Sequence, residues 1–305
     1  MSIRLILLLL CLTAFSFRAD KPAYRLYDTR LKSTTYAKLL RQATEADVVL
    51  FGELHNNPIC HWLELQLTKD LQAQKKGNLV LGAEMFETDN QTALTDYVQG
   101  RTTGKELATQ ARLWPNFDTD YKPITDFARD QKIPFIATNV PRRYASLVSR
   151  KGLGALDTLS PEAKRHIAPL PLTVDLTLPG YKAMLAMMNG SGHGDTNPHG
   201  GNNDMAANFA RAQAIKDATM AYFILQNVKP SQTLLHFNGD YHSKNFEGIV
   251  WYLRKQRPDL KIVTVSSLEL IDLDKPEQRT SEDATDNRNL ADFVLAIPAD
   301  MTKTY

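Results

Sequence analysis

The sequence contains 305 residues, of which 43% are hydrophobic and 23% are charged, and its formal net charge is +2. This is the composition of an ordinary globular protein, and the length permits one large domain with a sizeable core. A charge so close to neutral gives no basis for binding nucleic acid, so we expect no nucleic-acid partner.

Residues 1–16 have the pattern of a signal peptide. Arg4 gives a basic start, residues 5–15 form an apolar run too short to span a bilayer, and Ala14-Phe15-Ser16 fits a cleavage site. We therefore expect an exported protein, either periplasmic or membrane-associated. Cys11 lacks the small residues that normally precede a lipidated cysteine, so a lipid anchor there is the less favoured alternative. Cleavage would leave Cys60 as the only thiol and exclude an internal disulfide.

Residues 46–67 predict a strand, a polar loop and a helix. The apolar run from Val48 to Phe51 is typical of a strand buried on both faces. Asn57-Pro58 combines a capping residue with an early proline and predicts the start of the helix. Glu53 and His55 lie between them, two residues apart, so their side chains point the same way on an extended chain. In open α/β sheets ligands bind at such strand ends, which makes this junction a candidate site.

Two other predicted strands end in similar residues. Residues 78–84 finish with a glycine and Glu84, and residues 233–242 finish with Gly239, an aspartate and His242. This repetition predicts one polar cluster along one edge of the sheet. A carboxylate beside an imidazole can hold a divalent metal, move a proton or form a buried hydrogen-bonded pair.

The remaining pattern predicts an α/β fold, a mostly parallel β-sheet flanked by helices. We expect further strands at residues 24–30, 134–138, 260–266 and 293–297, and helices at 35–42, 88–98, 100–110, 124–131, 204–228 and 246–257. The aromatic residues of the loop at 114–123 are expected to pack over the sheet edge. Gln213 and Asp217 form a polar pair on one helix face, which is either solvated or turned toward the cluster.

Residues 153–201 predict an inserted helical subdomain between the two parts of the α/β domain, residues 22–152 and 202–305. The segment is rich in proline and shows no strand pattern. A short helix from Tyr181 to Met188 carries three methionines, and a Gly/Asn-rich loop, expected to be flexible, follows it. Composition favours a core helix with a surface loop. A Met-rich helix beside His193 and His199 also suits a large flat apolar ligand.

These residues carry a resemblance to a known family. The strand followed by Gly-Glu-x-His, with a second histidine six residues later at His61, resembles the ChaN-like haem-binding family of the wider Tiki/erythromycin-esterase-like group. Matching motifs follow in the same order, and they are Glu84-Met-Phe-Glu87, Tyr121-x-Pro123, Ala137-x-Asn139-x-Pro141-Arg142 and Ala212-Gln213-x-x-x-Asp217-Ala-Thr-Met-Ala221. The resemblance runs from about Tyr27 to the last predicted strands.

The resemblance implies an exported haem-binding protein of a haem or iron uptake system. It implies haem held near the helical subdomain by a tyrosinate, which favours ferric iron. It also implies a homodimer and an outer-membrane haem or iron receptor as partner. The expected haem-binding residues are Tyr181 first and Tyr144 second for the iron, His193 and His199 as alternatives or partners, and Arg142 and Arg143 for the propionates or the cluster carboxylates.

The alternative is a metal-dependent hydrolase of the Tiki/erythromycin-esterase-like type, so whether the protein is an enzyme stays open. The expected catalytic residues are Glu53, His55, Glu84 and His242, and the expected metal ligands are these four and His61. A divalent ion such as Mn or Zn lowers the pKa of a bound water, with Glu53 or Glu84 as general base. The sequence contains no Ser nucleophile elbow, no His-Glu-x-x-His and no Cys-x-x-Cys, which weakens this alternative.

Overall fold

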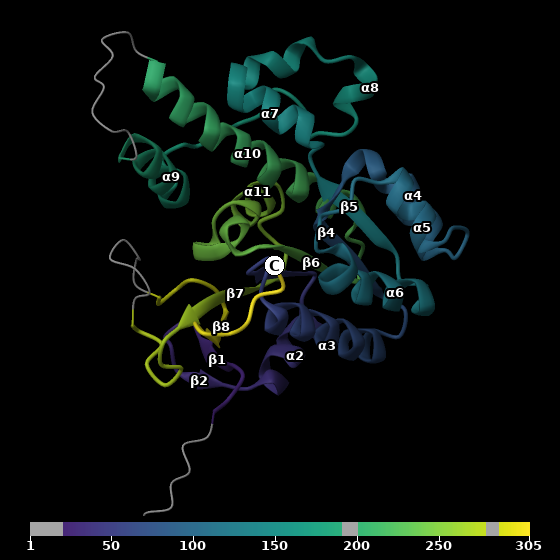
Figure 1. The fold of residues 1–305 in the computed structure, drawn as a ribbon, viewed down its shortest axis with the longest axis vertical. Coiled ribbons are helices and arrows are strands. Elements are labelled where there is room, and N and C mark those ends of the chain that lie inside the picture. Colours follow the sequence, from purple (N-terminus) through teal and green to yellow (C-terminus); the bar gives the residue numbers. More distant parts are fainter. Residues whose placement is uncertain (1–20, 191–200, 279–286) are drawn as a thin grey trace, which may run out of the picture.

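The computed structural model describes residues 21–190, 201–278 and 287–305 (Figure 1). The strands in this part of the chain form one sheet in the order β2-β1-β8-β7-β3-β6-β4-β5. They are β1 (Arg25–Asp28), β2 (Ser33–Thr34), β3 (Val48–Glu53), β4 (Leu79–Glu87), β5 (Phe135–Asn139), β6 (Thr233–Gly239), β7 (Ile262–Leu270) and β8 (Phe293–Pro298). Strand β1 pairs antiparallel with β2 and β8, and all other pairs are parallel. The predicted fold class is confirmed.

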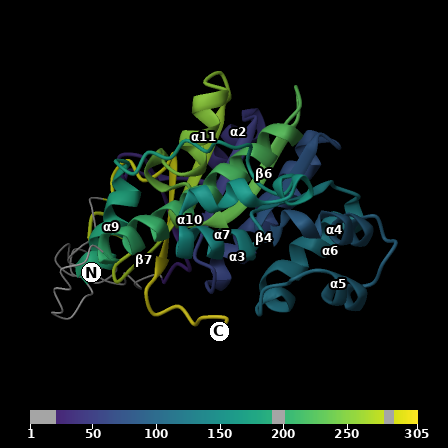
Figure 2. The same ribbon diagram turned by 90° about the horizontal axis from the view of Figure 1, so that it is seen from above.

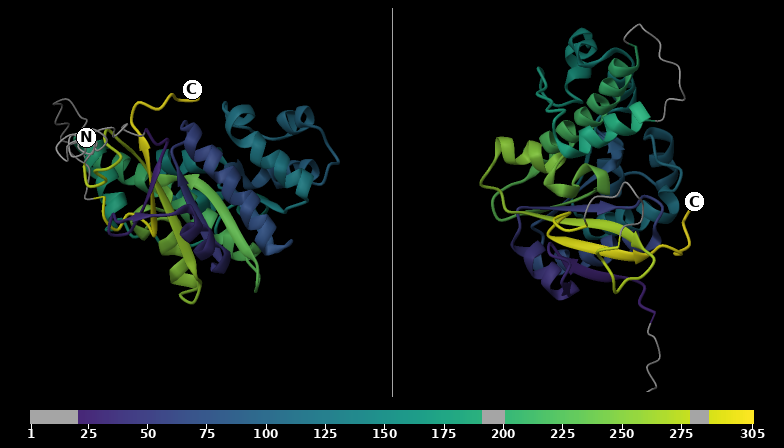
Figure 3. Two further views of the ribbon diagram at one scale, coloured as in Figure 1. Left: turned by 90° about the horizontal axis from the view of Figure 1, so that it is seen from below. Right: turned by 90° about the vertical axis from the view of Figure 1, so that its left-hand side faces the viewer.

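Helices cover both faces of this sheet (Figure 3, right). They are α2 (Tyr36–Glu45), α3 (Pro58–Lys75), α4 (Gln91–Val98), α5 (Gly104–Gln110), α6 (Lys122–Gln131), α7 (Arg142–Lys151), α8 (Pro161–Lys164), α9 (Pro179–Gly190), α10 (Gly201–Asn227) and α11 (Ile249–Gln256). Short helical turns are η1 (Thr88–Asn90), η3 (Leu153–Thr158), η4 (Asp240–His242) and η5 (Lys244–Phe246), and η2 (Phe117–Tyr121) is a π-helical turn. None of the described helices combines the length and apolar character needed to cross a membrane.

Strand β3 shows how the sequence builds two cores. All six of its residues are buried. Val49 and Phe51 join the core on the side of α2 and α3, whereas Val48 and Leu50 join the core on the side of α10 and α11. Alternate residues of a strand point to opposite faces, so a strand buried on both faces must be apolar throughout. This is why the unbroken apolar run predicted the central strand correctly.

The junction after β3 also folds as its sequence predicts. The side chain of Asn57 caps α3 by accepting a hydrogen bond from the backbone N–H of Ile59 (3.0 Å), and Pro58 occupies the first turn. Proline suits this position because it has no N–H to leave unpaired. The chain therefore turns sharply from strand to helix and leaves Glu53 and His55 at the strand end.

The described residues between 153 and 190 contain η3, the short helix α8 and the helix α9, and no strand. Helix α7 packs on α10 in one apolar cluster, and α9 packs on α10 through another, in which Tyr181 and Met184 contact Ala210 and Ala214. Figures 1 and 2 show α7, α9 and α10 next to one another beyond the carboxyl ends of the strands. The exact boundaries of the inserted subdomain remain a prediction. The predicted signal peptide, residues 1–16, and the central part of the Gly/Asn-rich loop, residues 191–200, lie outside the described residues.

Candidate functional site

A large cleft lies at the carboxyl ends of the parallel strands, beneath α7, α9 and α10. Its volume is about 770 Å³, which is typical of a small-molecule or cofactor site. Its apolar lining residues are Leu113, Trp114, Pro115, Val140, Ala145, Met184, Phe209 and Ala212. Its polar lining residues are His55, Glu84, Glu87, Arg112, Asn139, Arg142, Ser146, Ser149, Gln213, Lys216, Tyr241 and His242. The cleft therefore combines apolar walls with titratable groups.

The structure brings the predicted polar cluster together at the floor of this cleft. Strands β3, β6 and β4 are neighbours, so their carboxyl ends share one edge. The backbone N–H of Gly239 donates to Glu84 Oε2 (2.8 Å). A Cβ atom on Gly239 would lie 2.6 Å from His55 Nε2. Only glycine, which has no Cβ, allows the imidazole of His55 to approach this strand end so closely.

His242 is held between two buried carboxylates. Its Nδ1 lies 2.6 Å from Asp217 Oδ1 on α10, and its Nε2 lies 3.2 Å from Glu84 Oε1. Tyr181 donates its hydroxyl hydrogen bond to the other oxygen of Asp217 (2.6 Å). Burial alone would lower the pKa of His242, but the two carboxylates outweigh it and raise this pKa to about 10. His242 is therefore an imidazolium at neutral pH, and it holds the pKa of Glu84 well below its usual range against the effect of burial.

This arrangement makes stability depend on pH. A folded-state pKa of about 10 for His242 lies above the value of about 6.5 in an unfolded chain. The stabilisation is therefore complete below about pH 6.5 and is lost as the pH rises toward 10, at a cost of a few kcal/mol. We expect chelator-treated wild-type protein to lose stability to urea across this window and His242→Gln to lose much less. Equal losses of stability in the two proteins would contradict the raised pKa of His242.

His55 lies at the boundary between the cleft and the interior. Its Nδ1 is 2.7 Å from Glu53 Oε1, and Tyr121 donates its hydroxyl hydrogen bond to the same oxygen (2.7 Å). The ring of Trp114 contacts His55 edge-on, with 4.9 Å between ring centroids. Burial lowers the pKa of His55, but the hydrogen bond to Glu53 and the charge of Glu84 raise it above its ordinary value overall.

His61, predicted as a metal ligand, does not line the cleft. It lies behind the cleft floor on α3, with its Nε2 3.1 Å from the carbonyl oxygen of His55 and its Nδ1 3.2 Å from Glu64 Oε2. The five predicted metal ligands therefore form two groups. His55, Glu84 and His242 line the cleft, whereas Glu53 and His61 are buried behind it.

The predicted haem-binding residues are spread over different surroundings. Arg142 lines the cleft, whereas Arg143 pairs with Asp89 (2.5 Å) and lies over the ring of Tyr144. Tyr144 and Tyr181 are both buried, and neither is among the lining residues. His193 and His199 lie outside the described residues. The haem-binding roles of these residues remain predictions.

Several residues that the sequence did not single out belong to the site. Arg112 and Lys216 add positive charge to the cleft, and Tyr241 is the tyrosine among its lining residues. Lys216 could have been found, because it is three residues after Gln213 and so lies on nearly the same helix face. Tyr241 directly precedes His242, but a turn-forming segment gives no rule for where its side chain points. Lys216 occupies an unspecified position of the Ala212–Ala221 motif, so the motif itself did not single it out.

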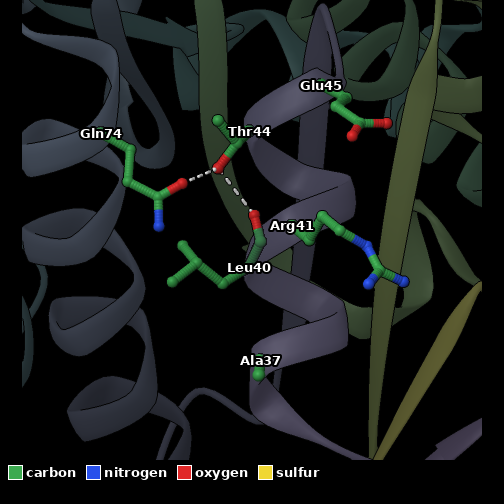
Figure 4. A pocket seen from close by; sticks show the side chains of 6 residues that line it. All are labelled: Ala37, Leu40, Arg41, Thr44, Glu45 and Gln74. Atoms are coloured by element: carbon green, nitrogen blue, oxygen red, sulfur yellow. Dashed lines mark hydrogen bonds between the residues drawn. The ribbon is translucent and has the colours of Figure 1, made fainter.

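A smaller hollow between α2 and α3 has none of these properties. Figure 4 shows its six lining side chains, with the Thr44 hydroxyl within hydrogen-bond distance of two acceptors, Leu40 O (2.8 Å) and Gln74 Oε1 (2.7 Å). Its volume is about 380 Å³. Arg41 and Glu45 point away from the hollow rather than converging on it (Figure 4). We therefore place the candidate site in the larger cleft.

The fold and the cleft define an α/β protein with a cofactor-sized site at the carboxyl ends of its parallel strands. The sequence of residues 39–253 matches the family described as haem-binding uptake, Tiki superfamily, ChaN. This match covers more than half of the chain, and the chain belongs to that family. The resemblance inferred from the motifs is confirmed.

Two known proteins are similar to this chain. The structure of ChaN from Campylobacter jejuni, described as binding heme cofacially, superposes with a TM-score of 0.66 at 18% identity and covers 90% of this chain and 97% of that chain. Protein RETICULATA-RELATED 5, chloroplastic, from Arabidopsis thaliana is 25% identical over 205 residues, which are 65% of this chain. The match covers 26% of that plant protein, so the chain spans about a quarter of its length. The ChaN structure, at this identity, supports the fold alone.

Proposed function

We propose that this protein binds haem in the cleft at the strand ends and serves a haem or iron uptake system. The observation that carries the proposal is the cleft itself. It combines about 770 Å³ of volume, walls such as Phe209, Met184 and Trp114, and three cationic side chains in a chain of the haem-binding ChaN family. Apolar walls suit the porphyrin faces, and cations suit its carboxylates.

The cationic side chains fit the two propionates of a haem. Arg112, Arg142 and Lys216 line the cleft from a loop, from α7 and from α10. Arginine matches the planar shape of a carboxylate with paired N–H donors, and lysine provides a compact charge. When bound, the haem would supply a ferric centre that needs an axial ligand. The protein residues would hold the propionates at the rim and exclude water from the porphyrin faces.

We propose a tyrosinate as the axial ligand. The candidate tyrosines differ in their burial, in their hydrogen-bond partners and in whether they line the cleft. Burial and the charge of Asp217 raise the pKa of Tyr181, the first candidate, which opposes its ionisation. Tyr144, the second, is buried among apolar residues of α7 and α10. Tyr241 lines the cleft and donates a hydrogen bond to the carbonyl of Gly180, although burial raises its pKa to about 12. We therefore add Tyr241 to the candidates and favour it.

A hemin titration of tyrosine variants tests the ligand. Replacing the ligand tyrosine with phenylalanine should remove the charge-transfer band of a tyrosinate complex and shift the Soret band. The three variants Tyr181→Phe, Tyr144→Phe and Tyr241→Phe can be compared under identical conditions. If each leaves the spectrum of the complex unchanged, a tyrosinate from these residues is contradicted.

Arg142 and Arg143 provide a matched comparison for the propionate contacts. Arg142→Ala should weaken hemin binding by about tenfold, equivalent to about 1.4 kcal/mol, because it removes a charge-assisted partner from the cleft. Arg143→Ala should leave hemin affinity unchanged, since Arg143 pairs with Asp89 away from the lining. Affinity is measured from the Soret absorbance. Equal weakening by both substitutions would contradict the proposed orientation of the propionates.

Export, dimer formation and a receptor partner are further parts of this proposal. The pattern of residues 1–16 supports export to the periplasm or to a membrane surface. The family resemblance supports a homodimer and an outer-membrane haem or iron receptor as partner. Cell fractionation tests the first, and sedimentation of the protein with and without hemin tests the second.

A metal-dependent hydrolase is the second candidate, and one observation favours it. His55, Glu84 and His242 converge at the floor of an open cleft, where a substrate could reach them. The structure of an erythromycin esterase in its open conformation has a TM-score of 0.46 at 11% identity and covers 91% of this chain and 83% of that chain. A similarity this low carries no implication for activity. A screen of ester and peptide substrates tests this candidate, and hydrolysis retained by His55→Ala and Glu84→Gln would rule out this cluster.

A further inference from the structure

A second group of possible ligand atoms lies behind the cleft floor. Glu53 at the end of β3 and His61 and Glu64 on α3 each offer one ligand atom, and these three atoms lie within 4.8 Å of one another. All three side chains are buried, with exposed fractions of 1%, 6% and 0%. The group is distinct from the cleft cluster, because none of its members lines the cleft.

Two carboxylate oxygens in this group have no hydrogen-bond partner. They are Glu53 Oε2 and Glu64 Oε1, and both are fully buried. The other oxygen of Glu53 is already satisfied, since it lies 2.7 Å from His55 Nδ1 and accepts a hydrogen bond from Tyr121. A buried carboxylate oxygen without a partner is costly, so these two atoms call for a neutralising partner, either a metal ion or a proton.

The orientation of His61 suits a metal ligand. Its Nε2 lies 3.1 Å from the carbonyl oxygen of His55, an acceptor that the neutral tautomer with its proton on Nε2 satisfies. In that tautomer Nδ1 keeps a lone pair, and Nδ1 lies 3.2 Å from Glu64 Oε2 and 3.5 Å from Glu53 Oε2. A histidine that donates one ring N–H to a backbone carbonyl and offers the other nitrogen is the usual arrangement at metal sites.

We propose that Glu53, His61 and Glu64 bind one divalent transition-metal ion, Mn²⁺ or Zn²⁺, in a closed site behind the cleft. Two carboxylates and a neutral imidazole carry a charge of −2, which such an ion neutralises. One nitrogen and two oxygen ligands suit these metals, since imidazole favours Zn²⁺ and carboxylates favour Mn²⁺. The ion ties α3 to the end of β3, and through Glu53 it fixes the imidazole of His55 at the cleft floor. Metal binding at this site depends neither on haem binding nor on hydrolysis.

Metal content of the purified protein tests the site. After stripping with chelator and dialysis against Mn²⁺ or Zn²⁺, wild-type protein should retain about one ion per chain, and the ion should raise the Tm. Glu64→Gln keeps the shape of the side chain but should lose the bound ion and the Tm shift. Glu84→Gln makes the same change in the cleft cluster and should retain both. Retention of the ion by Glu64→Gln, or its loss from Glu84→Gln, would overturn the proposal.

A spectroscopic measurement decides the question without a variant. Electron spin echo envelope modulation of Mn²⁺-loaded wild-type protein should show nitrogen coupling from a single imidazole, that of His61. Coupling from two imidazoles would assign the ion to His55 and His242 in the cleft, and it would overturn the proposal. Absence of nitrogen coupling, or of stoichiometric metal, would show an adventitious ion only and would overturn the proposal.

Discussion

Replacing Gly248 with alanine is expected to lower the free energy of unfolding by roughly 3 kcal/mol or more. Gly248 precedes α11 with φ 52° and ψ −120°, a conformation that residues with a Cβ rarely adopt. A Cβ atom there would overlap the carbonyl oxygen of His242 and lie 2.9 Å from its carbonyl carbon and 3.3 Å from Asp217 Cγ. Both the backbone conformation and the close approach therefore oppose the substitution.

Gly154→Ala is the matched control for this experiment. A Cβ atom on Gly154, in η3, would have no neighbour within 4 Å, and its φ is not in the left-handed region. The control should change stability by less than about 1 kcal/mol in either direction. Urea denaturation of both variants measures the difference. Similar stabilities would contradict the packing described around His242.

Replacing Asp217 with alanine is expected to destabilise the protein by about 3–5 kcal/mol. Asp217 is buried and accepts hydrogen bonds at 2.6 Å from both Tyr181 and His242. The substitution leaves a buried imidazolium with one carboxylate partner instead of two and leaves the Tyr181 hydroxyl without its acceptor. Removing one member of a buried charged group costs more than the net value of the interaction, because its partners remain buried.

Asp157→Ala removes an exposed carboxylate and should change stability by less than about 0.5 kcal/mol. The destabilisation by Asp217→Asn should fall between the values for Asp217→Ala and Asp157→Ala, since an amide keeps one oxygen acceptor without the charge. Chemical denaturation near pH 7 gives all three values. If Asp217→Ala is no more destabilising than Asp157→Ala, the charged contact between α10 and the cleft floor is not formed in solution.

The fold was largely predictable from local sequence patterns. The apolar run at Val48 to Phe51 and the Asn57-Pro58 helix start are local signals, and each element formed where it was expected. The position of β3 between β7 and β6 was not predictable, because strand order depends on contacts between distant segments. The π-helical turn at Phe117–Tyr121 replaced a predicted loop and directs Tyr121 inward to Glu53.

The site was predictable only in outline. Strand ends rich in Glu and His correctly indicated a shared edge, because parallel strands place their carboxyl ends together. Which groups pair within it depends on how each helix is rotated on the sheet, and a single sequence does not encode this locally. Asp217 could therefore be read as solvated or inward, and the structure turns it toward His242. Tyr181 was the first candidate for the iron ligand, which remains a prediction, and the sequence did not indicate that its hydroxyl donates to Asp217.

The most direct measurement is a hemin titration of wild-type protein beside two tryptophan variants of α7, followed by Soret absorbance. Ser146 lines the cleft, whereas Arg150 is exposed on the same helix and does not line it. Wild-type protein and Arg150→Trp should bind hemin saturably with equal affinity. Ser146→Trp should fill the cleft and weaken binding by about 100-fold or more, equivalent to about 2.7 kcal/mol. No saturable binding by wild-type protein, or unchanged binding by Ser146→Trp, would contradict a haem site in this cleft.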